Sequence, residues 1–329
     1  MNPFIAAMPK AELHLHLEGT LEPVLLSTLA ARNGVEVPIP DGAFTDLTSF
    51  LGQYYAAMGA LLTEQDFYDL AFTYLAKAHA QNIVHAELFF DPQAHTSRGV
   101  AFDAVIGGYH RAVEAASTEY GIDAVLVMCI LRDHSVESAE QTLTEALAYK
   151  QWIVGIGLDS DERDNPPAKF AAVFARARVE GFRLTMHCDV DQVGSIENIR
   201  QVLEDVGVDR IDHGTNIIED ARLVDLVRER GIGLTCCPLS NAIVSEGMKA
   251  TEIVGLLRAG VKVTINSDDP AYFGGYLTEN LQALAAATDL DRDELVQLQR
   301  NAFEVSWIGE EKRAAFLEAL DAYSGGASS

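Results

Sequence analysis

Short runs of β-branched and other apolar residues recur along the chain, and segments with helical periodicity separate them. This alternation is typical of a sheet built from parallel βα units. Eight units of this kind match a closed barrel, so we predict an α/β fold, a (β/α)8 barrel of the TIM type. The expected strands are Ala11–Leu17, Ile83–Phe90, Ala124–Leu131, Ile153–Asp159, Arg183–His187, Arg210–His213, Gly233–Cys236 and Val261–Ser267.

The connection between the first two expected strands is much longer than one crossover helix needs. Its first part, Glu22–Asn33, has a helical pattern. Residues 34–80 are predicted to form a helical insertion over the barrel mouth, where a lid shields an active site from water. A plain structural excursion is the alternative. No interdomain linker interrupts the pattern, so we expect residues 1–329 to form a single domain.

The C-terminal part of the chain has the pattern of additional helices. Two or three closing helices are expected within Glu279–Ala322. Residues 324–329 are rich in glycine and serine, and we expect them to form a flexible tail.

Composition indicates a globular protein from a reducing compartment. The chain has 329 residues, of which 48% are hydrophobic, enough to bury a large core. The segment Met1–Lys10 lacks the basic start and long apolar run of a secretion signal, so a cytoplasmic location is expected. Four cysteines form no CxxC pair, and adjacent Cys236 and Cys237 would make a strained disulfide, so we expect reduced thiols.

The acidic balance of the chain bears on its partners. Forty-nine acidic residues against 24 basic ones give a formal net charge of -25, which is spread along the chain. Such a charge repels phosphate backbones and acidic membrane surfaces. We therefore expect no nucleic-acid or membrane partner, and a neutral or cationic small molecule as the substrate. A solvated acidic exterior is the simpler explanation of the same charge.

Polar residues stand where the expected strands end. His14 and His16 lie on the first strand, where alternation places both imidazoles on one face. His187, His213 and the pair Asp268-Asp269 end the fifth, sixth and eighth strands. Active sites of barrels are built at these strand ends, although any single histidine there is also compatible with a core or turn position.

Together these side chains suit a metal centre. Three imidazoles and one carboxylate with an open position match a catalytic zinc ion, so His14, His16, His187 and Asp268 are the candidate ligands for one Zn²⁺ per chain. His213 is a candidate for orienting the metal water and carrying a proton. Asp269 is expected to face the substrate, with a simple Asp-Asp-Pro turn as the alternative.

The most specific segments of the sequence are Pro9-Lys-Ala-Glu-Leu-His-Leu-His-Leu-Glu-Gly19, Ile211-Asp-His-Gly214, Leu234-Thr-Cys-Cys-Pro-Leu-Ser-Asn241 and Asn266-Ser-Asp-Asp-Pro270. With these segments, the sequence resembles the adenosine and adenine deaminase family of the amidohydrolase superfamily over nearly its whole length. Two further segments, Glu87–Gly99 and Gly157–Glu162, look more like the adenine-type branch.

The resemblance implies a zinc-dependent hydrolytic deamination of a 6-aminopurine, with adenine favoured, to the 6-oxopurine and ammonia. It places the metal roles on the four candidate ligands and the water-orienting role on His213. It also places contact with purine N7 on Asp269 and a backbone contact on the turn that ends at Ser160. Glu18 stands where the nucleoside enzymes have an aspartate near the sugar, so it is a candidate substrate-binding residue.

One position departs from the family pattern. After the fifth strand the family has His-Ala-Gly-Glu, whose glutamate gives a proton to ring N1, whereas this chain has Val190 at that place. A valine cannot transfer a proton, and losing such a donor costs about a hundredfold or more in rate. Asp189 and Asp191 are the nearby carboxylates, and we favour Asp191 because its position matches a second acidic residue of the adenine-type pattern.

This departure keeps other functions open. The alternatives are deamination of adenosine, of an N6-substituted adenine or of another amino heterocycle, and a non-catalytic purine-binding protein. A related barrel hydrolase with a different amide or amine substrate is a further alternative. Iron and manganese remain alternatives to zinc, and a homo-oligomer is also compatible with the sequence.

Overall fold

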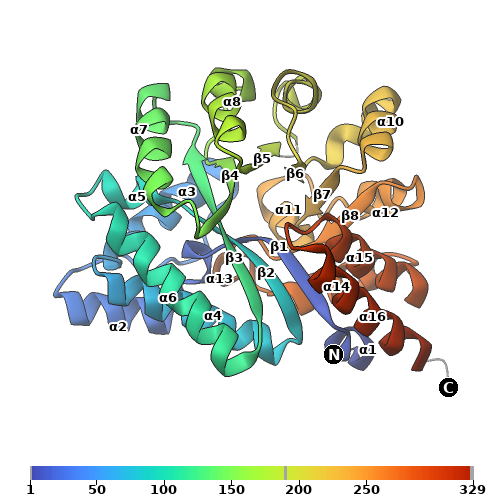
Figure 1. Ribbon diagram of the computed structural model, residues 1–329, viewed down its shortest axis with the longest axis horizontal. Helices are drawn as coiled ribbons and strands as arrows, with labels where there is room; N and C mark the ends of the chain where they lie inside the picture. Colours follow the sequence, from blue (N-terminus) through green and yellow to red (C-terminus); the bar gives the residue numbers. More distant parts are fainter. Residues whose placement is uncertain (1, 189–190, 327–329) are drawn as a thin grey trace.

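Eight parallel strands form the centre of the molecule, and helices surround them (Figure 1). The computed structural model describes residues 2–188 and 191–326. Neighbours along the chain are neighbours in the sheet, from β1 through to β8. The strands are β1 (Lys10–His16), β2 (Ile83–Phe90), β3 (Asp123–Leu131), β4 (Ile153–Asp159), β5 (Arg183–Cys188), β6 (Arg210–His213), β7 (Gly233–Cys236) and β8 (Lys262–Ile265).

Backbone hydrogen bonds close the sheet between its first and last strands. The amide of Asp268 donates to the carbonyl of His14 at 3.1 Å, and the amide of His16 donates to the carbonyl of Asp268 at 3.0 Å. A parallel bridge joins Leu15 to Asp268 at the same place. The predicted (β/α)8 barrel is therefore confirmed.

The strand boundaries agree with the predicted ones to within one residue, except at the end of β8. The apolar pattern predicts a strand through Ser267, whereas β8 ends at Ile265. The chain then turns so that Asp268, with a φ of 62°, reaches β1. A left-handed backbone at an aspartate is uncommon, and here the closure of the barrel holds it.

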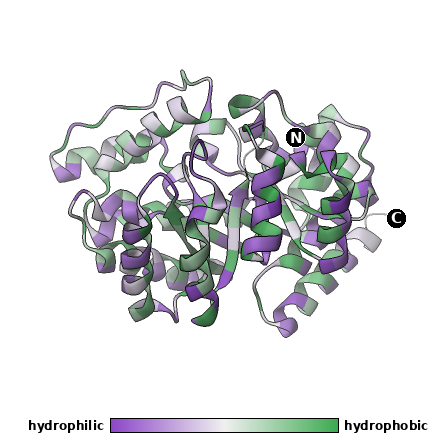
Figure 2. Ribbon diagram, turned by 90° about the horizontal axis from the view of Figure 1, so that it is seen from above, coloured by the Kyte–Doolittle hydropathy of each residue, from purple (hydrophilic) through white to green (hydrophobic). Residues whose placement is uncertain are grey.

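Helices connect the strands and cover the outside of the barrel, and polar and apolar residues alternate along them (Figure 2). Along the chain they are α1 (Pro3–Ala7), α2 (Pro23–Asn33), α3 (Leu47–Ala57), α4 (Glu64–Ala80), α5 (Pro92–Thr96), α6 (Phe102–Tyr120), α7 (Val136–Ala146), α8 (Ala171–Val179), α9 (Ser195–Arg200), which continues as a π-helix over Gln201–Val206, α10 (Ala221–Arg230), α11 (Pro238–Val244), α12 (Ala250–Arg258), α13 (Pro270–Phe273), α14 (Leu277–Ala287), α15 (Arg292–Val305) and α16 (Glu310–Gly326).

The predicted insertion at 34–80 divides into two parts with different positions. Helix α3 contributes side chains to a cavity at the C-terminal ends of the strands, which is the barrel mouth. Helix α4 instead packs along α6 and against β2, as a barrel helix does. A Cβ at Gly108 of α6 would lie 2.3 Å from the carbonyl oxygen of Glu64, so glycine permits this close packing. The lid position therefore belongs to α3.

Three closing helices, α14 to α16, follow the barrel, as the sequence indicates. The last of them extends beyond the predicted boundary. Helix α16 continues through Gly326, and the Ser324 hydroxyl donates to the Asp321 carbonyl at 3.0 Å, so residues 324–326 are helical rather than part of a tail. Residues 327–329 of the predicted tail lie outside the described residues. All four cysteines are buried and free, in agreement with the prediction.

Among the described residues, no helix combines the length and the apolar character that a membrane crossing requires.

A buried ion pair lies inside the barrel, below the strand ends that carry the histidines. Arg210 donates to a carboxylate oxygen of Glu87 at 2.6 Å, and both side chains are fully buried. The guanidinium also lies 4.1 Å from the centre of the Trp307 ring and donates to the Leu13 carbonyl at 3.2 Å. These contacts link β6 to β1, β2 and the segment after α15.

We predict that Arg210→Met lowers the free energy of unfolding by about 3–5 kcal/mol, because the buried Glu87 carboxylate loses its guanidinium partner. Denaturant unfolding measures the change. The double variant Arg210→Met with Glu87→Leu removes both charges and should recover most of the loss. A double variant as unstable as the single one would contradict this explanation.

Candidate active site

A cavity opens at the C-terminal ends of the strands, with about 450 Å³ of free space that is partly open to solvent. Side chains from β1, β4, β5, β6 and the segment after β8 line its inner part, and α3 lines its outer part. The lining residues are His16, Leu47, Phe50, Leu51, Tyr54, Tyr55, Asp91, Asp159, Ser160, His187, His213, Ser240, Val244, Asp268, Asp269 and Phe273.

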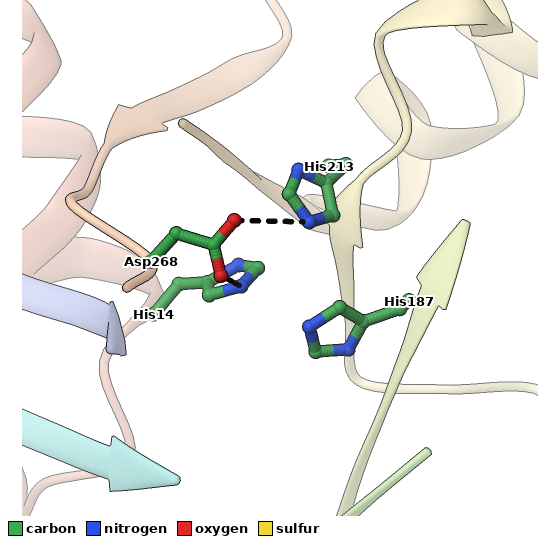
Figure 3. A group of neighbouring side chains, drawn as sticks. All are labelled: His14, His187, His213 and Asp268. Carbon is green, nitrogen blue, oxygen red and sulfur yellow. Dashed lines mark ion pairs between the residues drawn. The ribbon is translucent and has the colours of Figure 1, made fainter. Parts of the chain in front are cut away.

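Three of the four predicted metal ligands, His14, His187 and Asp268, meet at the inner end of this cavity together with His213, which was predicted to orient the metal water. His14, His187, His213 and Asp268 each offer one ligand atom, and these atoms lie within 4.8 Å of one another (Figure 3). His14 Nε2 is 3.3 Å from the Asp268 carboxylate, and His213 Nε2 is 3.7 Å from its other oxygen.

His16 belongs to the same group of side chains. Its Nε2 is 3.2 Å from Nε2 of His187 and 3.5 Å from the Asp268 carboxylate. The four predicted ligands, from β1, β5 and the segment after β8, therefore lie in one group of side chains, and His213 lies among them.

The hydrogen bonds of the outer ring nitrogens direct the Nε2 atoms inward. His187 Nδ1 lies 3.0 Å from the Leu158 carbonyl, which can only accept, so Nδ1 carries the proton and Nε2 keeps its lone pair. His14 Nδ1 lies 2.9 Å from the Thr235 hydroxyl. The buried Nε2 of His14 has no hydrogen-bond partner among the described residues. This donor set fits a divalent transition metal ion.

Burial keeps most of these imidazoles neutral, as metal ligands must be. It lowers the pKa of His16 and of His213 to about 4 each, and it lowers the pKa of His187 well below its usual value. At His14 burial acts in the same direction, but the carboxylates of Asp268 and Asp212 together outweigh it and raise the pKa.

Asp212 orients two of the histidines, and the sequence analysis did not assign it a role. Its carboxylate lies 3.5 Å from His187 Nδ1 and 3.9 Å from His14 Nδ1. It accepts hydrogen bonds from the hydroxyls of Thr185 at 2.7 Å and Thr235 at 2.9 Å. An aspartate inside a buried strand, next to His213 in sequence, is the signal that points to such a role.

Asp269 lies in the cavity wall, as predicted, and is almost fully buried. Its Oδ1 atom has no hydrogen-bond partner among the described residues. A Cβ at Gly19 would lie 2.0 Å from this atom, so only glycine at that position leaves room for the side chain. Asp269 is thus held against the segment after β1 with one oxygen available for a ligand.

A second pair of carboxyl groups, Asp91 and Asp159, lines the cavity at the ends of β2 and β4. A carboxylate oxygen of each lies within 4.8 Å of the other and of a ring nitrogen of His16. Burial together with the neighbouring acids raises the pKa of Asp91 well above its usual value and that of Asp159 to about 7. Asp159 also lies 3.5 Å from Nδ1 of the predicted ligand His16. The sequence analysis did not assign either aspartate a role.

Ser160 lines the cavity as predicted, in a left-handed turn with a φ of 74°. Its hydroxyl oxygen accepts a hydrogen bond of 2.7 Å from Tyr55 of α3. Glu18 is not among the described residues that line the cavity. Its Oε1 atom accepts from His95 and from Tyr109 at 2.9 Å each, so it ties the segment after β1 to α5 and α6. A substrate contact of Glu18 stays a prediction.

The structure does not place Asp191 with the other predicted site residues. Its carboxylate accepts from Lys249 Nζ at 2.6 Å and from the Glu246 amide at 2.9 Å, and it is not among the described cavity-lining residues. Burial opposes ionisation, but the contact with Lys249 outweighs it and lowers the pKa of Asp191. Asp189 and Val190 lie outside the described residues.

Comparison with known proteins shows one family over nearly the whole chain. The family model described as adenosine deaminase matches residues 9–323. An uncharacterized deaminase of Schizosaccharomyces pombe is 51% identical, over 98% of this chain and 97% of its own length. An adenine deaminase of Chlorobium phaeobacteroides is 47% identical over 98% of each chain.

Two solved structures are similar as well. An adenine deaminase from Arthrobacter aurescens is 40% identical and superposes with a TM-score of 0.92, over 97% of this chain and 100% of that one. An amidohydrolase from Burkholderia ambifaria with bound zinc is 25% identical, with a TM-score of 0.88 over 99% of this chain and 94% of that one.

We predict that the purified protein binds one divalent transition metal ion per chain, and that His187→Ala abolishes this binding because it removes a ligand. Thr235→Val should weaken binding about 10- to 100-fold, since it removes a group that orients His14. Competition with a chelator, followed by elemental analysis, measures both. Asp225→Asn, on the outer helix α10, is the control. Full metal content in His187→Ala would contradict the ligand set.

Proposed function

The chain belongs to the adenosine deaminase family, and from this premise we propose that it catalyses the zinc-dependent hydrolytic deamination of adenine to the 6-oxopurine and ammonia. The convergence of His14, His16, His187 and Asp268 around a set of inward-facing nitrogens carries the proposal. The adenine deaminases that are 40% and 47% identical over almost the full length support adenine as the substrate.

The four converging side chains would hold the zinc ion. When bound there, zinc supplies a water molecule made acidic enough to attack an electrophilic carbon at neutral pH. The amidohydrolase with bound zinc supports this ion over iron or manganese. The left-handed backbones of His213 and Asp268, with φ of 58° and 62°, hold both side chains toward the same point.

His213 has the position required to orient the attacking water and exchange a proton with it. Its Nε2 faces the Asp268 carboxylate at 3.7 Å, and the side chain lines the cavity. Because burial lowers its pKa to about 4, the imidazole is neutral at physiological pH and can accept a proton.

The remaining polar groups would hold the purine ring. Asp269 would contact N7 through its available Oδ1 atom, and the turn at Ser160 would contact the opposite side of the ring. The aromatic residues Phe50, Tyr54 and Tyr55 of α3 cover the cavity and exclude water from it. In the complete reaction, the oxygen of water would replace the amino group at C6, and the amino group would leave as ammonia.

Ring N1 must receive a proton during this exchange, and we assign it to Asp191 from the sequence pattern. The Asp191 carboxylate contacts Lys249, which lowers its pKa, so it must leave this lysine and take up a proton before it can donate one to a ligand in the cavity.

The proposal is tested by measuring ammonia release from zinc-loaded protein with adenine, adenosine and N6-methyladenine. We expect adenine to be the preferred substrate. His213→Gln should lower kcat about a hundredfold to ten-thousandfold while the zinc content is unchanged, because the variant cannot carry the proton. Binding of adenine without ammonia release would instead indicate a non-catalytic purine-binding protein, and release from adenosine alone would contradict the choice of base.

The role of Asp191 has a separate test. Asp191→Asn should lower kcat for adenine about a hundredfold if this residue supplies the proton. Lys249→Met removes the same ion pair and leaves the carboxylate in place, so it should retain most of kcat. Equal losses in the two variants would show that the pair only tethers the segment after β5. Asp189→Asn completes the comparison.

A further inference from the structure

We propose that Asp91 and its neighbour Asp159 form a subsite that accepts a hydrogen bond from the imidazole N–H of a free purine base, and that Asp91 thereby selects the base against 9-substituted purines. This inference rests on the proposed function. It assigns to Asp91 a direct contact with the substrate, on the opposite side of β1 from Asp269.

The two carboxyl groups have oxygens that no protein group satisfies. Asp91 is 1% exposed and Asp159 is 3% exposed, and both line the cavity. The Oδ1 atom of each is buried and has no hydrogen-bond partner among the described residues. A buried acceptor without a partner is destabilising unless a ligand satisfies it. A ligand with an N–H group at this place removes that cost.

The order of the strands places Asp91 near Asp269, so Asp91 would face the part of the purine ring next to N7. Asp269 follows β8 and Asp91 follows β2, and both strands neighbour β1. The two acids therefore lie on either side of the segment after β1, near enough for each to act on the other's charge. In a purine, N7 and N9 are the two nitrogens of one five-membered ring. With N7 at Asp269, N9 faces Asp91.

A free base and a nucleoside differ in the atom that faces Asp91. Adenine has one imidazole N–H and one bare ring nitrogen, so it can satisfy both acids, one as donor and one as acceptor. A purine substituted at N9 has no imidazole N–H and leaves the Asp91 oxygen buried and unpaired. A site with buried polar groups of this kind strongly rejects a ligand that lacks the matching hydrogen-bonding group.

Helix α3 closes the space that a substituent at N9 would occupy. The Tyr54 hydroxyl donates to Asp91 Oδ2 at 3.4 Å, and Tyr54 is only 3% exposed. Its ring packs against Tyr272 with centroids 5.7 Å apart. Hydrogen bonding and steric exclusion therefore act on the same position of the substrate.

Asp91 and Asp159 have different relations to the metal centre, which makes Asp91 the residue to test. Asp159 lies 3.5 Å from Nδ1 of His16, and its replacement also disturbs a metal ligand. The Asp91 side chain accepts from Tyr54, and its backbone amide donates to Glu18 Oε1 at 3.4 Å. One of its oxygens lies within 4.8 Å of His16 and Asp159, farther from His16 than the ion-pair distance of Asp159. A change at Asp91 should therefore leave zinc bound.

The experiment compares adenine with 9-methyladenine in the wild type, Asp91→Asn and Asp91→Ala, with Asp225→Asn as the surface control. Zinc-loaded protein is used for calorimetric binding and for ammonia release, and zinc content and Tm are measured for every variant. We expect Asp91→Ala to weaken adenine binding about 10- to 100-fold and to leave 9-methyladenine nearly unchanged. Asp91→Asn, which keeps an acceptor oxygen, should lose less.

Each outcome separates this inference from the proposed function. Equal losses for the two ligands, or a wild type that binds both equally, overturn the role of Asp91 and leave adenine deamination intact. Adenine binding that depends on Asp91 without ammonia release supports the subsite and overturns the proposed reaction. A second zinc ion that is lost in Asp91→Ala assigns these oxygens to a metal and overturns the subsite. A wild type that binds neither purine overturns both proposals.

Discussion

The pairing of Asp268 with β1 is the constraint on which the rest of the site depends. Its amide and carbonyl bond to His14 and His16, and this pairing closes the barrel. The same contact brings the Asp268 carboxylate within 3.5 Å of both imidazoles. Glu12 strengthens the junction, since it accepts from the amide of Ser267 at 3.0 Å and from the hydroxyls of Ser267 and Tyr74. The contact that closes the fold therefore also brings together the histidines and the aspartate that could hold a metal ion.

The electrostatics of the cavity follow from that arrangement. Buried carboxyl groups of Asp91, Asp159, Asp268 and Asp269 gather around three neutral imidazoles. A cluster of buried carboxyl groups costs free energy unless a cation or hydrogen-bond donors compensate it. A divalent metal ion satisfies the inner part, and a heterocycle with N–H groups satisfies the outer part. The chemistry of the proposed substrate thus matches the unpaired acceptors of the site.

The fold and the inner site were predictable from sequence because their signals are local. Alternation of strand and helix patterns placed eight strands close to their observed bounds, and polar residues at strand ends stood out against apolar runs. The insertion was harder. Residues 34–80 were predicted to form one insertion over the mouth, yet α3 lies over the mouth and α4 is a barrel helix. Which surface an amphipathic helix covers depends on its partners, and local periodicity does not encode them.

The sequence alone determined the barrel, the histidines and the aspartate that meet at its open end, since residue type and the alternation of apolar and polar segments can be read from short stretches of the chain. Tertiary structure decided the roles of Asp212, Asp91 and Asp159, and it placed Asp191 against Lys249 and Glu18 against His95. Each of these depends on which residues, distant in the chain, become neighbours inside a low-dielectric interior. A carboxylate looks the same in sequence whether its oxygen faces a lysine, a histidine or an empty cavity, and only the packed neighbours settle which.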